Sequence, residues 1–98
     1  MSPRPKKPRT CACPHRPPGC SVFKPAGIPL KDLSCVDLHH DELEALRLCD
    51  SERLSQAEAG ARMGVSRGTV QRLVIAGRKK MVDAIVTVQA LVLKPDGE

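Results

Sequence analysis

Residues 55–72 read SQAEAGARMGVSRGTVQR, and this stretch decides the fold. Ser55 is followed three residues later by Glu58, and a pair of this kind forms the capping box that opens many helices. Gly64 comes soon afterwards, and glycine readily adopts the left-handed backbone found just past a helix end. The spacing therefore predicts a helix over about 56–63.

A second helix is predicted directly after this turn. Ser66 can cap it, so that it begins at Arg67. Two helices joined by about three residues that include a glycine have the spacing of a helix-turn-helix. Steps of three, four and one separate the apolar residues of the second helix, as expected for a single buried stripe. These residues are Val70, Leu73, Val74, Gly77, Met81, Ala84, Ile85 and Val88.

Upstream of these two helices the pattern predicts a third helix over about 41–51. Asp41 and Glu44 have the spacing of another capping box. Residues 33–38 could form a short extended segment before it. At the far end of the chain, residues 85–93 are rich in β-branched side chains and could turn from helix into strand.

Composition sets the expected boundaries. Residues 1–31 hold eight of the nine prolines, and proline fixes its own φ and lacks an N–H donor. We therefore expect a basic, proline-rich arm over 1–31, a helix-turn-helix domain over 32–93 and a tail over 94–98. The predicted fold class is mainly α, with a tri-helical helix-turn-helix domain.

The second helix of a helix-turn-helix lies in the major groove, and its N-terminal residues reach base edges. On the outward face, Arg67 can donate two hydrogen bonds to guanine and Gln71 can pair with adenine. Gly68 lets the backbone approach closely. The expected contacts to the DNA backbone carry hydroxyl, amide or guanidinium groups: Ser55, Gln56, Ser66, Thr69 and Arg72. Farther along, Arg78, Lys79 and Lys80 are expected to meet flanking phosphate or solvent.

The charge is unevenly distributed along the chain. The net charge is +5, and the runs 1–24 and 67–80 contain basic residues and no acid. This pattern favours a polyanionic partner. A single aromatic residue, Phe23, argues against single-stranded nucleic acid, which usually stacks on aromatic rings. The arm could follow the minor groove through Arg4, Lys6, Lys7 and Arg9, or could be a solubilising tail.

A cluster of thiols and imidazole within the arm suggests an alternative function. Zinc prefers such ligands, and four of them could close a tetrahedral site. Their spacing differs from the paired Cys-x2-Cys of common zinc modules, so loose, reduced cysteines are the alternative, and we expect no cofactor unless zinc binds here. The four residues are Cys11, Cys13, His15 and Cys20. Cys35 and Cys49 are expected to be small buried residues.

Other classes find little support. No apolar run approaches the ~18 residues of a membrane span, and no apolar stretch follows the basic N-terminus as in a signal peptide. We therefore expect a cytoplasmic protein that makes no membrane contact. The sequence has no phosphate-binding glycine loop and no His-Glu-x-x-His motif, so we expect no enzyme. The second half of the last helix must be covered by the first helix, by the arm or by a second subunit, so a homodimer is one expected form.

Residues 54–80 resemble region four of bacterial sigma factors. The segments 3–9, 23–29 and 41–48 extend the resemblance to a family of small prokaryotic proteins, which is uncharacterised and predicted to bind DNA. The resemblance implies a sigma-region-four-like helix-turn-helix, and some longer members of the family add a domain similar to those that bind iron–molybdenum cofactor.

Three functional hypotheses follow. The first is a sequence-specific double-stranded DNA-binding protein that regulates transcription, with a recognition helix over about 67–80. The second is a metal-binding or redox-sensing module built on the cluster between Cys11 and Cys20. The third is a protein-interaction module of the transcription machinery.

Overall fold

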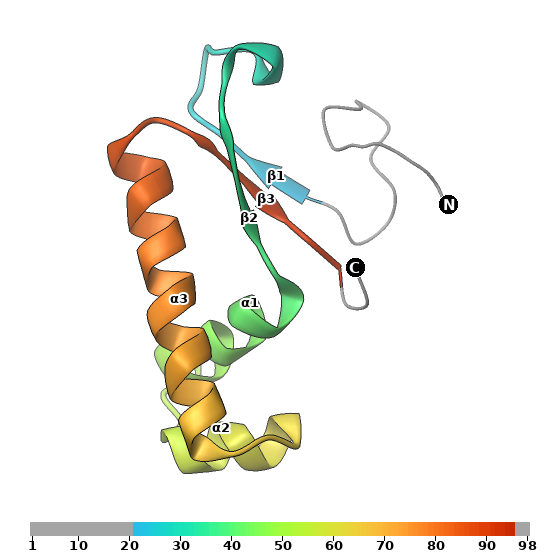
Figure 1. The fold of residues 1–98 in the computed structure, drawn as a ribbon, viewed down its shortest axis with the longest axis vertical. Coiled ribbons are helices and arrows are strands. Elements are labelled where there is room, and N and C mark those ends of the chain that lie inside the picture. The colour runs from blue at the N-terminus through green and yellow to red at the C-terminus, as the bar shows by residue number, and fades with distance from the viewer. Residues whose placement is uncertain (1–20, 96–98) are drawn as a thin grey trace.

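The computed structural model describes residues 21–95 and contains three helices and a small three-stranded sheet (Figure 1). Helical turns account for more than half of these residues. The elements in chain order are β1 (Ser21–Phe23), the 3₁₀ turn η1 (Leu30–Asp32), β2 (Cys35–Leu38), α1 (His40–Leu46), the π-helical turn η2 (Arg47–Ser51), α2 (Gln56–Met63), α3 (Arg67–Val86) and β3 (Ala90–Leu93).

The sheet has the order β1-β3-β2, so the last strand lies in the middle. β1 is antiparallel to β3, with Val22 opposite Val92, and β2 is parallel to β3, with Val36 opposite Leu91. Extended structure near residues 33–38 and a strand near Ala90 were expected and are present. β1 was not expected, and it brings part of the range 1–31, predicted as an arm, into the sheet.

The two caps around the α2–α3 turn form as predicted. Ser55 Oγ accepts the Glu58 N–H at 3.1 Å, and Glu58 Oε1 accepts the Ser55 N–H at 2.9 Å. Gly64 ends α2 in the left-handed region with φ 74°. Ser66 Oγ accepts the Thr69 N–H at 3.1 Å at the start of α3. Local hydrogen bonding thus fixes both ends of the turn.

The predicted cap of α1 is wrong. The helix begins at His40, and Glu42 Oε1 accepts the backbone N–H of His39 at 2.9 Å, so the box lies two residues earlier than expected. Glu44, assigned to the cap, instead accepts hydrogen bonds from Arg47 at 2.8 and 3.0 Å. The earlier start is favoured because Glu42 can also reach α3, as described below.

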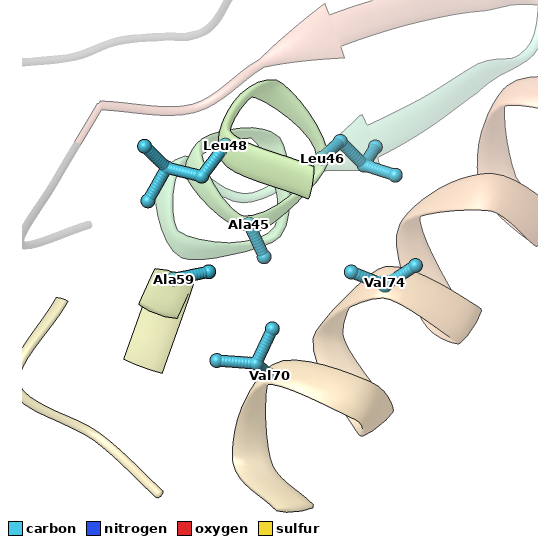
Figure 2. Close-up of a cluster of buried hydrophobic side chains, with 6 residues drawn as sticks. All are labelled: Ala45, Leu46, Leu48, Ala59, Val70 and Val74. Carbon is cyan, nitrogen blue, oxygen red and sulfur yellow. The ribbon is translucent and has the colours of Figure 1, made fainter. Parts of the chain in front are cut away.

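The helical core lies where the three helices meet, and Figure 2 shows its side chains converging from α1, η2, α2 and α3. Its buried members are small or branched aliphatic residues: Ala45, Leu46, Leu48, Ala59, Val70 and Val74. Burying each larger aliphatic side chain contributes about 1.5–3 kcal/mol. Gly77 allows α1 and α3 to pack closely, because a Cβ there would lie 2.8 Å from Leu46 Cδ1, which would have to shift.

A second buried layer joins the end of α3 to the sheet. Ala84 of α3 is buried, as are Leu38 of β2 and Ala90 and Val92 of β3. Figure 1 shows α3 as the longest element, with α2 at its N-terminal end and the sheet toward its C-terminal end. None of the helices in residues 21–95 has the length and apolar character of a membrane span.

Candidate nucleic-acid interface

The turn between α2 and α3 is tight. The Val65 N–H donates to the Gly60 carbonyl at 2.9 Å, and a Cβ on Gly60 would lie 2.6 Å from the Val65 carbonyl oxygen. The backbones on the two sides of the turn therefore approach as closely as glycine allows. This contact holds the first turn of α3 at a fixed position relative to α2.

A chain of hydrogen-bonding side chains lies along the first turns of α3. The hydroxyl groups of Ser66 and Thr69 are 3.0 Å apart, and Arg72 Nη2 donates to Thr69 Oγ1 at 3.2 Å. Spacing of three residues keeps all three on the same side of the helix. The Arg72 guanidinium is thus positioned while most of its five donors remain available.

The two side chains predicted to read bases lie at the surface of the same turns. Arg67 and Gln71 are both exposed, and neither makes a hydrogen bond or ion pair within residues 21–95. Between them, a Cβ on Gly68 would have only Arg72 Nη1 at 3.8 Å and Ser66 Oγ at 4.0 Å nearby. Packing therefore does not require glycine at position 68, in contrast to Gly60, whose Cβ would meet backbone.

The basic residues farther along α3 are paired within the molecule. Arg78 donates to both oxygens of Asp50, at 2.6 and 3.1 Å, and lowers the pKa of that carboxyl below its ordinary value. As expected, Arg78 and Lys79 remain exposed to solvent, and each also forms an ion pair with an acid of the same chain, whereas Lys80 is half-buried. The other two pairs are Lys79–Asp83 at 2.6 Å and Lys80–Glu42 at 2.8 Å.

The start of α2 offers a weaker set of contacts. The Ser55 hydroxyl and N–H are already engaged with Glu58, and Gln56 is half-buried. The hydrogen bond from the Ser55 backbone lowers the pKa of Glu58, so this helix end holds a negative charge.

Arg53 was not among the predicted site residues. It is exposed at φ 66°, two residues before the cap of α2, and has no acid partner among the described residues.

Several predicted site residues lie outside the described residues. These are the basic arm positions Arg4, Lys6, Lys7 and Arg9 and the candidate metal ligands Cys11, Cys13, His15 and Cys20. Within residues 21–95, no group of three or more His, Cys, Asp or Glu side chains could hold a metal ion.

The expectation for the remaining cysteines is only partly correct. Cys49 packs partly buried against the helical core. Cys35 is exposed, so the expectation of burial is wrong there, because β2 is an edge strand whose alternate side chains face outward.

The comparisons with known proteins place the chain in a family. The protein-family model described as "Protein of unknown function DUF134" matches residues 1–98. The chain belongs to this family. This agrees with the expected resemblance to an uncharacterised prokaryotic family, and no solved structure matches the chain.

Family relatives match over most of the chain. A UPF0251 protein of Vibrio vulnificus (strain YJ016) is 48% identical over 91 residues, which cover 93% of this chain and 88% of the relative. A UPF0251 protein of Shewanella sediminis (strain HAW-EB3) is 49% identical over 92 residues, with coverages of 93% and 92%. A UPF0251 protein of Desulforudis audaxviator is 50% identical over 74 residues, which cover 76% of this chain and 48% of that longer relative.

Proposed function

We propose that this protein binds double-stranded DNA in a sequence-specific manner and regulates transcription without acting as an enzyme. In this proposal α2, the turn and α3 act as a sigma-region-four-like helix-turn-helix. α2 would cross the DNA backbone, and α3 would be the recognition helix over about 67–80, with its first turns in the major groove.

The observation that carries the proposal is how the charge on α3 is distributed between free and paired groups. Arg78, Lys79 and Lys80 each form an ion pair with an acid of the same chain. Arg67 and Arg72, in the first two turns of the helix, have no acid partner within residues 21–95. The free positive charge therefore coincides with the helix N-terminus, which itself attracts anions.

The exposed face of these turns has the groups that base recognition requires. Arg67 offers two parallel N–H donors for the O6 and N7 of guanine, and Gln71 offers a donor and an acceptor for the N6 and N7 of adenine. Ile75 lies one turn beyond Gln71 and is 59% exposed, so its methyl groups suit the C5-methyl of thymine. Gly68 leaves room for the groove edge to approach the backbone.

Phosphate contacts would fix the register of the helix. The phosphates of one DNA strand could be bound by two sets of groups at the start of α3. These are the hydrogen-bonded side chains of Ser66, Thr69 and Arg72 and the backbone N–H groups of the first turn. The DNA backbone that α2 crosses could be contacted by residues just before and at the start of this helix, namely Arg53, Ser55 and Gln56.

The proposal is tested by selecting bound sequences from a random duplex pool near physiological salt. Arg67→Ala is compared with Lys79→Ala, which removes the same charge from the same helix at a paired, exposed position. We expect the wild type and Lys79→Ala to recover one motif, and Arg67→Ala to lose preference at one base pair. Failure of the wild type to recover any motif would contradict the proposal, and so would identical motifs for all three proteins.

A further inference from the structure

An apolar groove lies between the second half of α3, α1 and the sheet, at the opposite end of α3 from the candidate DNA contacts. Its volume is about 810 Å³. The walls include Leu38 and Leu43 on one side and Met81, Ile85 and Val88 on the other, with Phe23 of β1 at the edge. Leu38 is almost fully buried at the base of the groove, whereas Phe23 is 63% exposed.

A ridge of aliphatic side chains stands beside this groove on α3. Ile85 and Val86 are 76% and 71% exposed, and Val82 is 57% exposed. Val82 neighbours both of the others, because residues three and four apart are adjacent on a helix surface. Together with the groove, these side chains form a contiguous exposed apolar patch. On soluble monomers such patches rarely exceed ~300–600 Å², and larger ones usually mark an interaction site.

The area involved fits a specific interface. Seven large apolar residues along the groove edge and the ridge are between 36% and 76% exposed, and covering them would bury a surface on the order of the ~800 Å² that each partner buries in a standard interface. A small apolar ligand in the groove would leave this surface mostly open, since Val82 and Val86 do not line the groove.

We propose that a second copy of this chain covers the surface, with the ridge of each subunit seated in the groove of the other. A ridge and a groove side by side on one surface are self-complementary, as a two-fold contact requires. Beside the ridge, the charges of Lys79, Lys80 and Asp83 are paired within the subunit. At the groove edge, Lys24 Nζ donates to the Ile28 carbonyl at 2.7 Å.

The proposed dimer leaves the other end of α3 free. Ile85 lies about 27 Å along the helix from Arg67, at 1.5 Å per residue. Self-association therefore stands independently of DNA binding, and its test needs no DNA.

The test is the mass of the full chain in solution, measured by sedimentation equilibrium under reducing conditions from about 1 to 200 µM. Ile85→Glu places a charge on the ridge, and Ile75→Glu places the same charge on an exposed aliphatic position of α3 outside it. Both positions are mostly exposed in the single chain, so neither variant should disturb the fold, and circular dichroism checks this.

We expect the mass of two chains for the wild type and for Ile75→Glu, and at least a 100-fold weaker association for Ile85→Glu. A wild type with the mass of one chain at every concentration would overturn the proposal. Equal masses for Ile85→Glu and the wild type would also overturn it, as would a wild-type mass that grows without limit, which indicates head-to-tail contact.

Discussion

Two adjacent lysines on α3 show that the contribution of a charged residue to stability depends on the burial of its partner. Lys79 pairs with Asp83 one turn away, and both side chains are largely exposed to solvent. Lys80 pairs with Glu42 of α1, whose side chain is only 9% exposed. Glu42 Oε1 also accepts the N–H that caps α1, so one carboxylate joins the start of α1 to the middle of α3.

We therefore predict that Lys80→Ala lowers the free energy of unfolding by about 2 kcal/mol, because it leaves the Glu42 carboxylate buried without its cation. Lys79→Ala should change it by less than about 0.5 kcal/mol, as expected for an exposed pair. Urea unfolding of the two variants measures the difference. Equal losses would show that the Lys80–Glu42 pair contributes no more than a surface pair.

A substitution at Gly68 should have opposite effects on the stability of the fold and on DNA affinity. Its environment is open, so Gly68→Ala should raise the free energy of unfolding by up to about 1 kcal/mol through helix propensity. The same methyl group would stand between the backbone and the groove, so DNA affinity should fall. Gly77→Ala is the contrast, because its Cβ would meet Leu46 and offset the gain. A Gly68→Ala protein with higher stability and unchanged affinity for selected DNA would refute this role.

At the scale of elements, the cap of α2 makes the helix sensitive to acid. The Ser55 N–H bond holds the pKa of Glu58 below its ordinary value. A carboxyl with a lowered folded-state pKa stabilises the fold above its unfolded pKa, and this stabilisation is lost as pH falls through the folded value.

Glu58→Gln should keep the geometry of the cap and remove its charge. We predict that the wild type is the more stable protein near neutral pH and that the gap in Tm closes as pH falls below about 4.5. Thermal unfolding followed by circular dichroism from pH 7 to pH 2.5 tests this. A gap that stays constant with pH would mean that the carboxylate charge has no part in the cap.

Elements set by neighbouring residues were predictable from the sequence, and those set by distant partners were not. The α2 cap, the turn at Gly64 and the start of α3 depend on residues within four positions, so local pattern sufficed. The strand β1 exists only because β3, about seventy residues later in the chain, offers it an edge. Its two apolar side chains, Val22 and Phe23, were the sole local signal.

In the candidate site too, features set by neighbouring residues were predictable and those set by distant partners were not. Arg67, Gln71 and Arg72 could be identified from helical spacing, since an outward face follows from an inward one. The pairing of Arg78 with Asp50 and of Lys80 with Glu42 joins residues 28 and 38 positions apart, which no local pattern shows. Arg53 was missed because its position depends on how η2 leads into α2 and not on a motif.

At the scale of the whole molecule, we propose that the two ends of α3 have different tasks. Its first turns present free polar groups, and its last turns present an apolar surface, with the helical core holding both in one rigid element. A two-fold pairing through the last turns would present two sets of DNA contacts and would suit a DNA site with two-fold symmetry.

The basic arm should act on all DNA sequences alike. We predict that Arg4 and Lys6 contact phosphates, so replacing both with alanine should flatten the slope of log affinity against log salt by roughly 2. Lys31→Ala combined with Lys79→Ala removes the same charge elsewhere and should leave the slope nearly unchanged. Titrations of one duplex between 50 and 200 mM salt measure both slopes. Equal flattening in the two double variants would show that only net charge matters.

The most direct test of the central claim is the ratio of affinities for a selected duplex and for a scrambled duplex of the same composition, measured at physiological salt. We predict that the wild type prefers the selected duplex by a factor of about 10³ or more, as sequence-specific proteins do. Arg67→Ala should lose ten-fold or more of this preference while binding the scrambled duplex almost as well as before. A wild-type ratio near one would contradict the account and leave only a basic protein that binds polyanions.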